Sequence, residues 1–328
     1  MFLSQGSGDL CNRYRPRTFS NVIEQNTVIR SLQSAVLSEN KEQTYLFYGE
    51  HGTGKTTTAR ILAMSLNCSN LKDNGDPCTI CEDCSNIIKD VHPAVIEMDA
   101  SDKTSVNDIR TLKEGLGLRP LMGKAKVLIL DECHQLSSSA QNALLKISEK
   151  PPKGVFFILC STEPKKILPT LRARSQGHKF TLVSNKSIRN LIQMVATVEV
   201  GDIQEDIVDA LTEVSEGRPR NALKNLQKAI YIGLGNRKAV LGSLDLGERD
   251  PELISLCRLV MKFDVTWREV VSQYKKLPST IDAETMRRVL AGWFRSCLER
   301  ARTPIEARRA ARALELFVEI FPPVKPEN

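Results

Sequence analysis

The chemistry in this sequence starts with a short glycine-rich stretch. Residues 49–56 read GEHGTGKT and fit the pattern G-x-x-x-x-G-K-[ST] in full, a pattern whose glycines let backbone N–H groups curl around phosphate oxygens. An apolar run at 44–48 precedes the stretch and a helical run at 56–66 follows it, so the helix start would point its positive end at the same anion. We expect Lys55 to reach the β- and γ-phosphates of a nucleotide and Thr56 to ligate Mg²⁺.

The predicted nucleotide-binding residues comprise this whole loop and the residue after it. His51 lies between constrained positions of the loop, so a role for it as a ligand or base is the weaker interpretation. The loop residues that we expect around the phosphates are Gly49, Glu50, His51, Gly52, Thr53, Gly54, Lys55, Thr56 and Thr57.

A pair of acidic residues follows the apolar run KVLILD at 126–131. The run ends in Asp131 and Glu132, which places both carboxylates at the carboxyl edge of a parallel sheet, where ligands bind. We expect Asp131 to hold the Mg²⁺ shell and Glu132 to orient and deprotonate an attacking water. An acid-rich strand end without a function is the alternative, which the phosphate-binding loop upstream disfavours. The pair therefore predicts ATP hydrolysis.

Four of the nine cysteines are concentrated just behind the phosphate-binding loop. Their spacing, C-x9-C-x2-C-x2-C, suits four thiolates around a tetrahedral Zn²⁺, and Gly75 and Pro77 favour the turn that this arrangement needs. The intervening helix spans roughly 18 Å, so a metal there cannot touch the phosphates, and we expect a structural role. A redox or disulfide role and incidental cysteines without a role are the alternatives. The predicted zinc ligands are Cys68, Cys78, Cys81 and Cys84.

Strand-like and helix-like runs alternate up to about residue 180, which predicts an α/β domain with a parallel sheet covered on both faces by helices. The expected strands are 44–48, 94–98, 126–131 and 154–160. The expected helices are 26–38, 55–66, 105–116 and 138–149.

The rest of the chain reads as helical, with a break at EGRP, 216–219, and a Gly/Leu-rich stretch at 233–251. We therefore expect a nucleotide-binding domain over 1–182 with the cysteine module at 68–84 inserted in it. A small helical lid over 183–241 and an all-helical domain over 242–328 would follow. At about 100–200 residues per domain, the length fits this division.

Composition sets broad limits on function. No run approaches the ~18 apolar residues of a membrane span, and the N-terminus lacks a secretory signal, so we expect a cytoplasmic protein without membrane contacts. The net charge of +7 permits a polyanionic partner without establishing one.

Several stretches together resemble the gamma/tau subunits of the bacterial DNA polymerase III clamp loader, which are AAA+ ATPases. The resemblance covers about 13–226 and is dense in motifs, whereas the last ~85 residues match the family's helical collar only in composition and length. We expect a short gamma-like or virus-encoded form, and a truncated form that lacks a tau-like tail is the alternative. The matching stretches are RYRPRTFSNVIEQ (13–25), the phosphate-binding loop with its cysteines, ILDECHQLSSSAQNALLKISEKPP (129–152), FFILCSTEPKKILPTLRARSQ (156–176) and SEGRPRNALKNL (215–226).

The resemblance implies an adenine-binding box and a sensor 1 position. The box contributes Arg13, Tyr14 and Pro16 to the nucleotide site, although Glu24 stands where the family often has glycine. Ser161 and Thr162 end the strand beside the acidic pair and occupy the sensor 1 position, where a hydroxyl senses the γ-phosphate or the attacking water.

Two arginine roles follow from the same resemblance. Arg174 corresponds to the arginine finger offered in trans to a neighbouring subunit, and it is kept although Ala173 and Ser175 depart from the family's S-R-C motif; Arg172 is the rival. Arg220 corresponds to sensor 2, and Arg218 is the alternative to it.

The family implies a function and partners. The chain would be an ATPase subunit that uses ATP, Mg²⁺ and a structural Zn²⁺ in a hetero-pentamer, opens a sliding clamp and loads it on primer–template DNA. Backbone phosphates of DNA would meet Thr104, Ser105 and the nearby Lys103 and Arg110. The alternatives are another AAA+ DNA motor, such as a branch-migration helicase, and a structural clamp-loader subunit that does not hydrolyse ATP.

Overall fold

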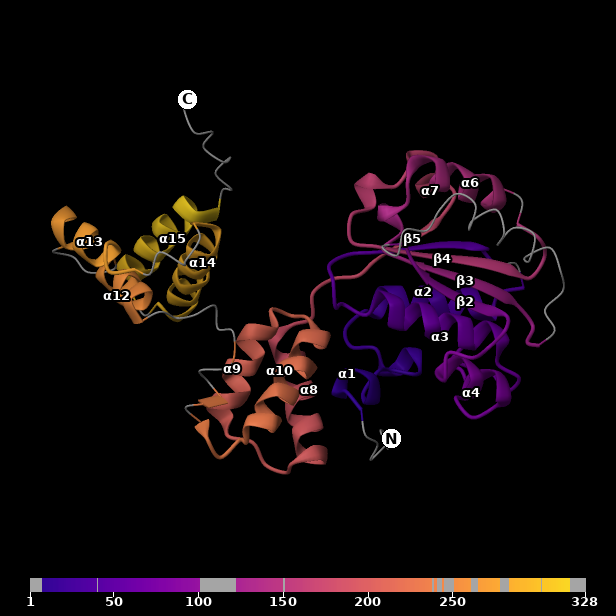
Figure 1. The fold of residues 1–328 in the computed structure, drawn as a ribbon, viewed down its shortest axis with the longest axis horizontal. Coiled ribbons are helices and arrows are strands. Elements are labelled where there is room, and N and C mark those ends of the chain that lie inside the picture. Colours follow the sequence, from indigo (N-terminus) through magenta and orange to yellow (C-terminus); the bar gives the residue numbers. More distant parts are fainter. Residues whose placement is uncertain are drawn as a thin grey trace. The chain divides into compact units, whose positions relative to one another are not determined.

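The computed structural model divides the chain into two compact units, residues 1–243 and 244–328, and Figure 1 shows the helices and strands of each. The expected boundary at 241/242 lies next to this division, whereas the expected boundary at 182/183 falls inside the first unit. The residues that the structure describes are 8–39, 41–100, 122–149, 151–237, 239–240, 244, 251–260, 265–277, 283–301 and 303–318.

The first unit contains a five-stranded sheet in the order β2-β3-β4-β1-β5, and every neighbouring pair is parallel. This confirms the predicted parallel α/β architecture. Because the side chains of β1 alternate between faces, Tyr45 and Phe47 enter one core while Leu46 enters the other. The strands are β1 (Thr44–Tyr48), β2 (Val95–Asp99), β3 (Lys126–Asp131), β4 (Val155–Ser161) and β5 (Gln176–Lys179).

The two edge strands differ from the sequence expectations. β2 is not covered on both faces, since Ile96 remains 37% exposed and Glu97 and Asp99 face solvent. β5 was not predicted, because its sequence QGHK lacks an apolar run. It pairs with β1 through its backbone, with Gln176 opposite Tyr45, and an edge strand can form in this way without apolar side chains on every position.

Helices cover the sheet on both faces (Figure 1). One core lies under α2 (Asn26–Leu37), α3 (Lys55–Asn67) and α4 (Glu82–Ile88), and the other lies under α6 (Ser138–Ser148) and α7 (Pro169–Ala173). The ends of α2, α3 and α6 agree with the predicted helices to within a residue, whereas the predicted helix 105–116 lies outside the described residues. Short 3-10 helices connect these elements at Phe19–Asn21, Cys133–Gln135 and Pro164–Lys166.

Three helices form the lid within the first unit: α8 (Asn185–Glu199), α9 (Glu205–Ser215) and α10 (Pro219–Ile232). The predicted break before α10 is present, because Glu216 and Gly217 adopt left-handed backbone conformations with φ of 48° and 71°. Pro219 then occupies the first turn of α10, where its fixed φ favours a helix start. The short helix α1 (Leu10–Arg13) packs against α10.

The second unit is helical, as the sequence predicted. Its helices are α12 (Pro251–Val260), α13 (Trp267–Tyr274), α14 (Ala283–Arg300) and α15 (Pro304–Val318). Cys257, Leu290 and Phe294 form its buried core, and Phe317 stacks on Phe294 with ring centroids 5.8 Å apart. Thr266 and Glu269 form a capping box at the start of α13, which satisfies backbone N–H groups there.

Candidate nucleotide site and cysteine centre

The phosphate-binding loop joins β1 to α3 and depends on glycine at its first position. Gly49 has φ of 144°, and an added Cβ would lie 2.2 Å from the carbonyl oxygen of Phe180. No other residue fits there without moving the backbone of the segment that follows β5. Gly54 has φ of 103° and caps the start of α3, so the first turn of that helix leaves its N–H groups directed at the loop.

Lys55 and Thr56 lie at the centre of this site. The Nζ of Lys55 donates to the carbonyl oxygens of Gly49 and Glu50, both at 2.9 Å, and burial lowers the pKa of this lysine while nearby acids oppose that shift. The Oγ1 of Thr56 donates to Oδ2 of Asp131 at 2.6 Å. The two residues predicted to ligate Mg²⁺ therefore converge, although they lie on α3 and β3.

Glu132 follows β3 in a left-handed conformation, with φ of 46°, and this turns its carboxylate toward the phosphate-binding loop. Oε2 accepts a hydrogen bond from Oγ1 of Thr162 at 3.1 Å and lies 3.3 Å from Nδ1 of His134. Oε1 lies 3.3 Å from Nδ1 of His51. The contact with His51 could not be predicted from the sequence, because the loop and the strand end meet only in the folded chain.

The two sensor 1 candidates differ in what they contact. Ser161 is fully buried, where its Oγ accepts from the N–H of Glu163 at 3.0 Å and lies 3.3 Å from Nδ1 of His134. Thr162 instead contacts Glu132 directly. Of the two hydroxyls, that of Thr162 is therefore placed to influence a reaction at the acidic pair.

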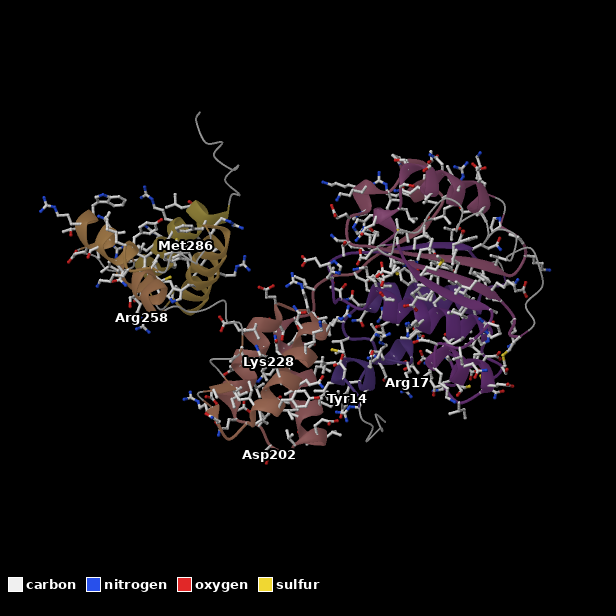
Figure 2. All side chains as sticks on the ribbon, viewed as in Figure 1. Tyr14, Arg17, Asp202, Lys228, Arg258 and Met286 are labelled. Carbon is white, nitrogen blue, oxygen red and sulfur yellow. The ribbon has the colours of Figure 1, made fainter. Side chains whose placement is uncertain are left out.

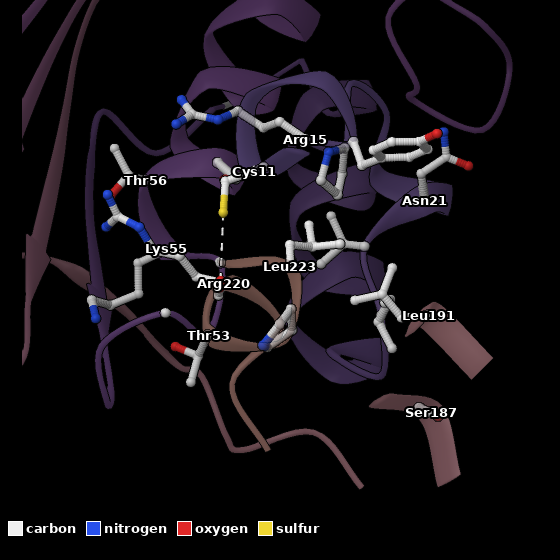
Figure 3. A pocket seen from close by; sticks show the side chains of 18 of the residues that line it. Cys11, Arg15, Asn21, Thr53, Lys55, Thr56, Ser187, Leu191, Arg220 and Leu223 are labelled. Atoms are coloured by element: carbon white, nitrogen blue, oxygen red, sulfur yellow. Dashed lines mark hydrogen bonds between the residues drawn. The ribbon is translucent and has the colours of Figure 1, made fainter. Parts of the chain in front are cut away.

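A cavity of about 500 Å³ connects the phosphate-binding loop with the lid. Figure 3 shows side chains from the N-terminal segment, the loop and the lid around it, and its dashed line marks the contact from Cys11 Sγ to the carbonyl oxygen of Arg220 at 3.5 Å. The apolar lid residues Leu191, Met194 and Leu223 suit the face of a base, and the loop suits phosphates. Its lining includes the predicted residues Tyr14, Pro16, His51, Gly52, Thr53, Gly54, Lys55, Thr56, Thr57, Asp131, Glu132 and Arg220.

The sequence predicts that Arg13 binds nucleotide, but Arg13 is not among the described residues that line the cavity. Its Nη2 donates to Oε2 of Glu199 at 2.6 Å, and the hydroxyl of Tyr14 donates to Oε1 of the same carboxylate at 2.5 Å. Figure 2 shows Tyr14 on the N-terminal segment beside the lid helices. Burial raises the pKa of Tyr14 to about 12, and Glu199 adds to that rise. Arg13 therefore braces the N-terminal segment against α8.

The glutamate that departs from the family's glycine also reaches the lid. Glu24 takes the left-handed conformation that glycine adopts readily, with φ of 57°. Its carboxylate accepts hydrogen bonds from the N–H and hydroxyl of Ser184 and from the hydroxyl of Ser187. Burial would raise the pKa of Glu24, but these hydrogen bonds outweigh it and lower the pKa. Glutamate in place of glycine therefore adds a carboxylate that binds the start of α8.

The two sensor 2 candidates have different surroundings. Arg220 lines the cavity beside the loop. Arg218 instead forms ion pairs with Glu50 of the loop and Glu216 of the lid. This difference favours Arg220 for a contact with a nucleotide in the cavity.

The arginine finger candidate lies away from this cavity. Arg174 ends α7, is 47% exposed and has its Nη2 3.4 Å from Oε1 of Glu149. Arg172 is exposed two residues earlier, in the last turn of α7. The predicted DNA contacts at Lys103, Thr104, Ser105 and Arg110 lie outside the described residues.

The four predicted zinc ligands come together at the far end of α3. Their Sγ atoms all lie within 4.8 Å of one another, close to the roughly 3.8 Å separation of thiolates around a tetrahedral zinc. All nine cysteines lie among the described residues and none forms a disulfide, so the disulfide alternative has no bond in this structure. The backbone N–H of Cys78 donates to Sγ of Cys68, and that of Cys81 donates to Sγ of Cys78.

The protonation of these thiols also fits a cation site. Burial would raise the pKa of Cys78, but hydrogen bonds from the N–H groups of Ile80 and Cys81 outweigh it and lower the pKa to about 6. Burial raises the pKa of Cys68 and Cys84. A soft cation would compensate buried sulfur atoms, and four sulfur ligands suit Zn²⁺.

The parallel sheet, the phosphate-binding loop, the acidic pair and the three-helix lid define a P-loop protein of the AAA+ class. The branch migration motor RuvB of Thermotoga maritima has a similar fold, with a TM-score of 0.54 at 17% identity, covering 89% of this chain and 93% of that one. A family model described as "DNA polymerase III, delta subunit" matches residues 24–184.

Curated relatives narrow this class. The DNA polymerase III subunit gamma/tau of Mycobacterium tuberculosis is 34% identical over 223 residues, which cover 67% of this chain and 38% of that protein. The subunit tau of Escherichia coli is 33% identical over 258 residues, covering 77% of this chain and 39% of that protein. The chain belongs to the gamma/tau family of DNA polymerase III subunits.

The chain spans less than two fifths of the length of these two relatives. None of the helices in the described ranges combines the length and apolar character that crossing a bilayer demands.

Proposed function

We propose that the chain is the ATP-hydrolysing subunit of a clamp loader, which uses ATP to open a sliding clamp and load it on primer–template DNA. One observation carries the enzymatic part: Thr56 contacts Asp131 at 2.6 Å while the neighbouring Glu132 contacts Thr162 at 3.1 Å, both at the mouth of the phosphate-binding loop. A structural subunit would not need this arrangement. The family of the relatives supports the replication role.

Each residue then has a task. Lys55 and the loop N–H groups bind the phosphates, Arg220 meets them from the lid, and Glu132 orients and deprotonates the attacking water. Thr56 and Asp131 would hold Mg²⁺, which would supply neutralisation of phosphate charge. The hydroxyl–carboxylate contact between Thr56 and Asp131 supports this pair as its ligands, since both present oxygen atoms to one point.

The test is steady-state ATP turnover with and without a sliding clamp and primed DNA. The proposal expects turnover that rises when both are added, without unwinding of a duplex. Duplex unwinding coupled to ATP would identify a helicase instead, and binding without any turnover in every mixture would identify a structural subunit.

The arginine finger is proposed to act in trans. Its support is the position of Arg174, half exposed and separate from the residues lining the cavity of its own chain. A guanidinium offered to a neighbouring subunit would stabilise transition-state charge and make hydrolysis depend on assembly. We expect Arg174→Ala to bind ATP normally and to lose turnover in the assembled complex. Equal loss in Arg172→Ala alone would transfer the role to that residue.

The cysteine module is proposed to bind one structural Zn²⁺ through all four thiolates. The clustered sulfur atoms and the N–H contacts to two of them support it. Four protein ligands leave no open position for water, so catalysis at this centre is excluded. Other clamp-loader subunits, the clamp and DNA backbone phosphates near Thr104, Ser105 and Arg110 are the proposed partners.

A further inference from the structure

The start of α10 lies directly against the phosphate-binding loop. A Cβ added to Gly52 would lie 3.3 Å from Cβ of Arg220 and 3.5 Å from Cβ of Arg218. The missing side chain of Gly52 therefore lets the first turn of α10 approach the loop closely. Any shift of this turn would move Arg220 relative to the phosphate site.

An ion pair crosses this contact. Nη2 of Arg218 lies 2.6 Å from Oε2 of Glu50, whereas its Nη1 contacts Glu216. Glu50 belongs to the loop and Glu216 to the lid, so one guanidinium links the two parts of the nucleotide site. Burial would lower the pKa of Arg218, but the two carboxylates outweigh it and raise the pKa.

The backbone couples the position of Arg218 to the position of Arg220. The N–H of Arg218 donates to the carbonyl oxygen of Ser215 at 2.8 Å, and its own carbonyl oxygen accepts from the N–H of Ala222 at 3.1 Å. Pro219 stands between the two arginines with a fixed φ. Fixing the side chain of Arg218 to the loop therefore fixes the orientation of Arg220 two residues later.

We propose that Arg218 and Glu50 form an ionic clasp that fastens the lid to the phosphate-binding loop and positions Arg220 for the nucleotide. This inference rests on the proposed function, since it assigns both residues to ATP binding. Arg218 is a positioning residue that acts through Arg220. Glu50 contributes its carboxylate to the clasp, whereas the backbone of the same loop serves the phosphates.

The clasp and a purely electrostatic effect of Glu50 on ATP predict opposite changes in ATP affinity for Glu50→Gln. Side-chain exposures of 24% for Arg218 and 55% for Glu50 indicate a pair that adds little to folding stability. If Glu50 acted only through its charge, Glu50→Gln would remove repulsion and tighten ATP binding. The clasp predicts the opposite, because Arg220 loses its position.

The experiment measures the equilibrium Kd of the whole chain for the fluorescent analogue mant-ATP with Mg²⁺, and thermal unfolding verifies that each variant folds. We expect Arg218→Gln and Glu50→Gln each to weaken binding by about threefold. The double variant should be no weaker than Arg218→Gln alone, because the same interaction is lost once.

A matched control is Arg189→Gln, which breaks a comparably exposed set of ion pairs with Glu205 and Asp209 inside the lid and should leave the Kd unchanged. Raising the salt concentration should weaken wild-type binding more than that of Arg218→Gln, because salt screens the pair.

The outcomes separate the clasp from the function on which it rests. Wild-type chain that fails to bind mant-ATP would overturn both. Wild-type binding with Glu50→Gln equal to or tighter than wild type would overturn the clasp alone.

Discussion

The cysteine centre and the nucleotide pocket are built in opposite ways. All four clustered cysteines lie between positions 68 and 84, and the N–H contacts to their sulfur atoms join residues at most ten positions apart. The pocket gathers residues from position 11 to position 223, and its polar contacts join residues separated by 75 and 168 positions. One site is local in the chain, whereas the other exists only after the sheet and lid have assembled.

Because the two sites are assembled differently, substitutions in them should have different effects. A local centre stabilises the segment around it and should leave distant chemistry unchanged. A site assembled from distant segments couples binding and catalysis to the packing of whole elements. Substitutions in the two sites can therefore test this contrast.

The largest effect is expected for the acidic pair. Glu132→Gln keeps the shape of the side chain but cannot deprotonate water, so we expect kcat to fall at least about 100-fold with ATP affinity retained. Single-turnover release of phosphate measures the step. The matched control is Glu163→Gln, which removes an exposed carboxylate near His134 and should keep its turnover. Loss of binding instead of turnover in Glu132→Gln would contradict the base assignment.

Next comes the cysteine centre. Cys81→Ser removes one sulfur ligand, so we expect bound zinc to fall from about one per chain toward zero and the unfolding temperature to drop by about 5 °C. Metal analysis and calorimetry measure both, and Cys297→Ser should change neither. The affinity for ATP should stay within about twofold of wild type. If ATP binding were lost while the unfolding temperature stayed unchanged, the cysteine centre would not act only as a local stabilising site.

A smaller effect is expected at the contact between Thr162 and Glu132. Thr162→Val removes the hydroxyl that orients the carboxylate, and we expect kcat to fall about tenfold with an unchanged KM. Thr162→Ser keeps the hydroxyl and should restore most of the rate. A valine variant as fast as wild type would show that the hydrogen bond does not contribute to the rate.

The smallest effect concerns the brace between the N-terminal segment and the lid. Burial would raise the pKa of Glu199, but hydrogen bonds from Tyr14 and Arg13 outweigh it and lower the pKa below the ordinary 4.5. Because the folded-state pKa is depressed, this stabilisation is present above pH 4.5 and is lost as the pH falls through the folded-state pKa.

Glu199→Gln should therefore cost about 1–2 kcal/mol of unfolding free energy at pH 7. Its difference from wild type should shrink in denaturant titrations below pH 4.5. A difference that stayed constant over that range would mean that the carboxylate charge contributes nothing to the brace.

The sequence by itself determined the strands β1, β3 and β4, the phosphate-binding loop, the acidic pair and the cysteine cluster. Buried parallel strands carry continuous apolar runs, and motifs whose residues lie close in the chain keep their spacing whatever the rest of the fold does. The polar edge strand β5 and the exposed face of β2 could not be read, because edge strands depend on backbone pairing with a neighbour.

Residues of similar type could be assigned to different positions in the site only from the tertiary structure. Arg218 and Arg220 are equivalent in sequence, but the approach of α10 to Gly52 leaves one beside Glu50 and the other on the cavity. Thr162 contacts Glu132 and Ser161 does not reach it through any described hydrogen bond, although the two are neighbours at the end of β4. Arg13 faces Glu199 because α1 packs on the lid. These distinctions rest on contacts between distant segments, which no local pattern records.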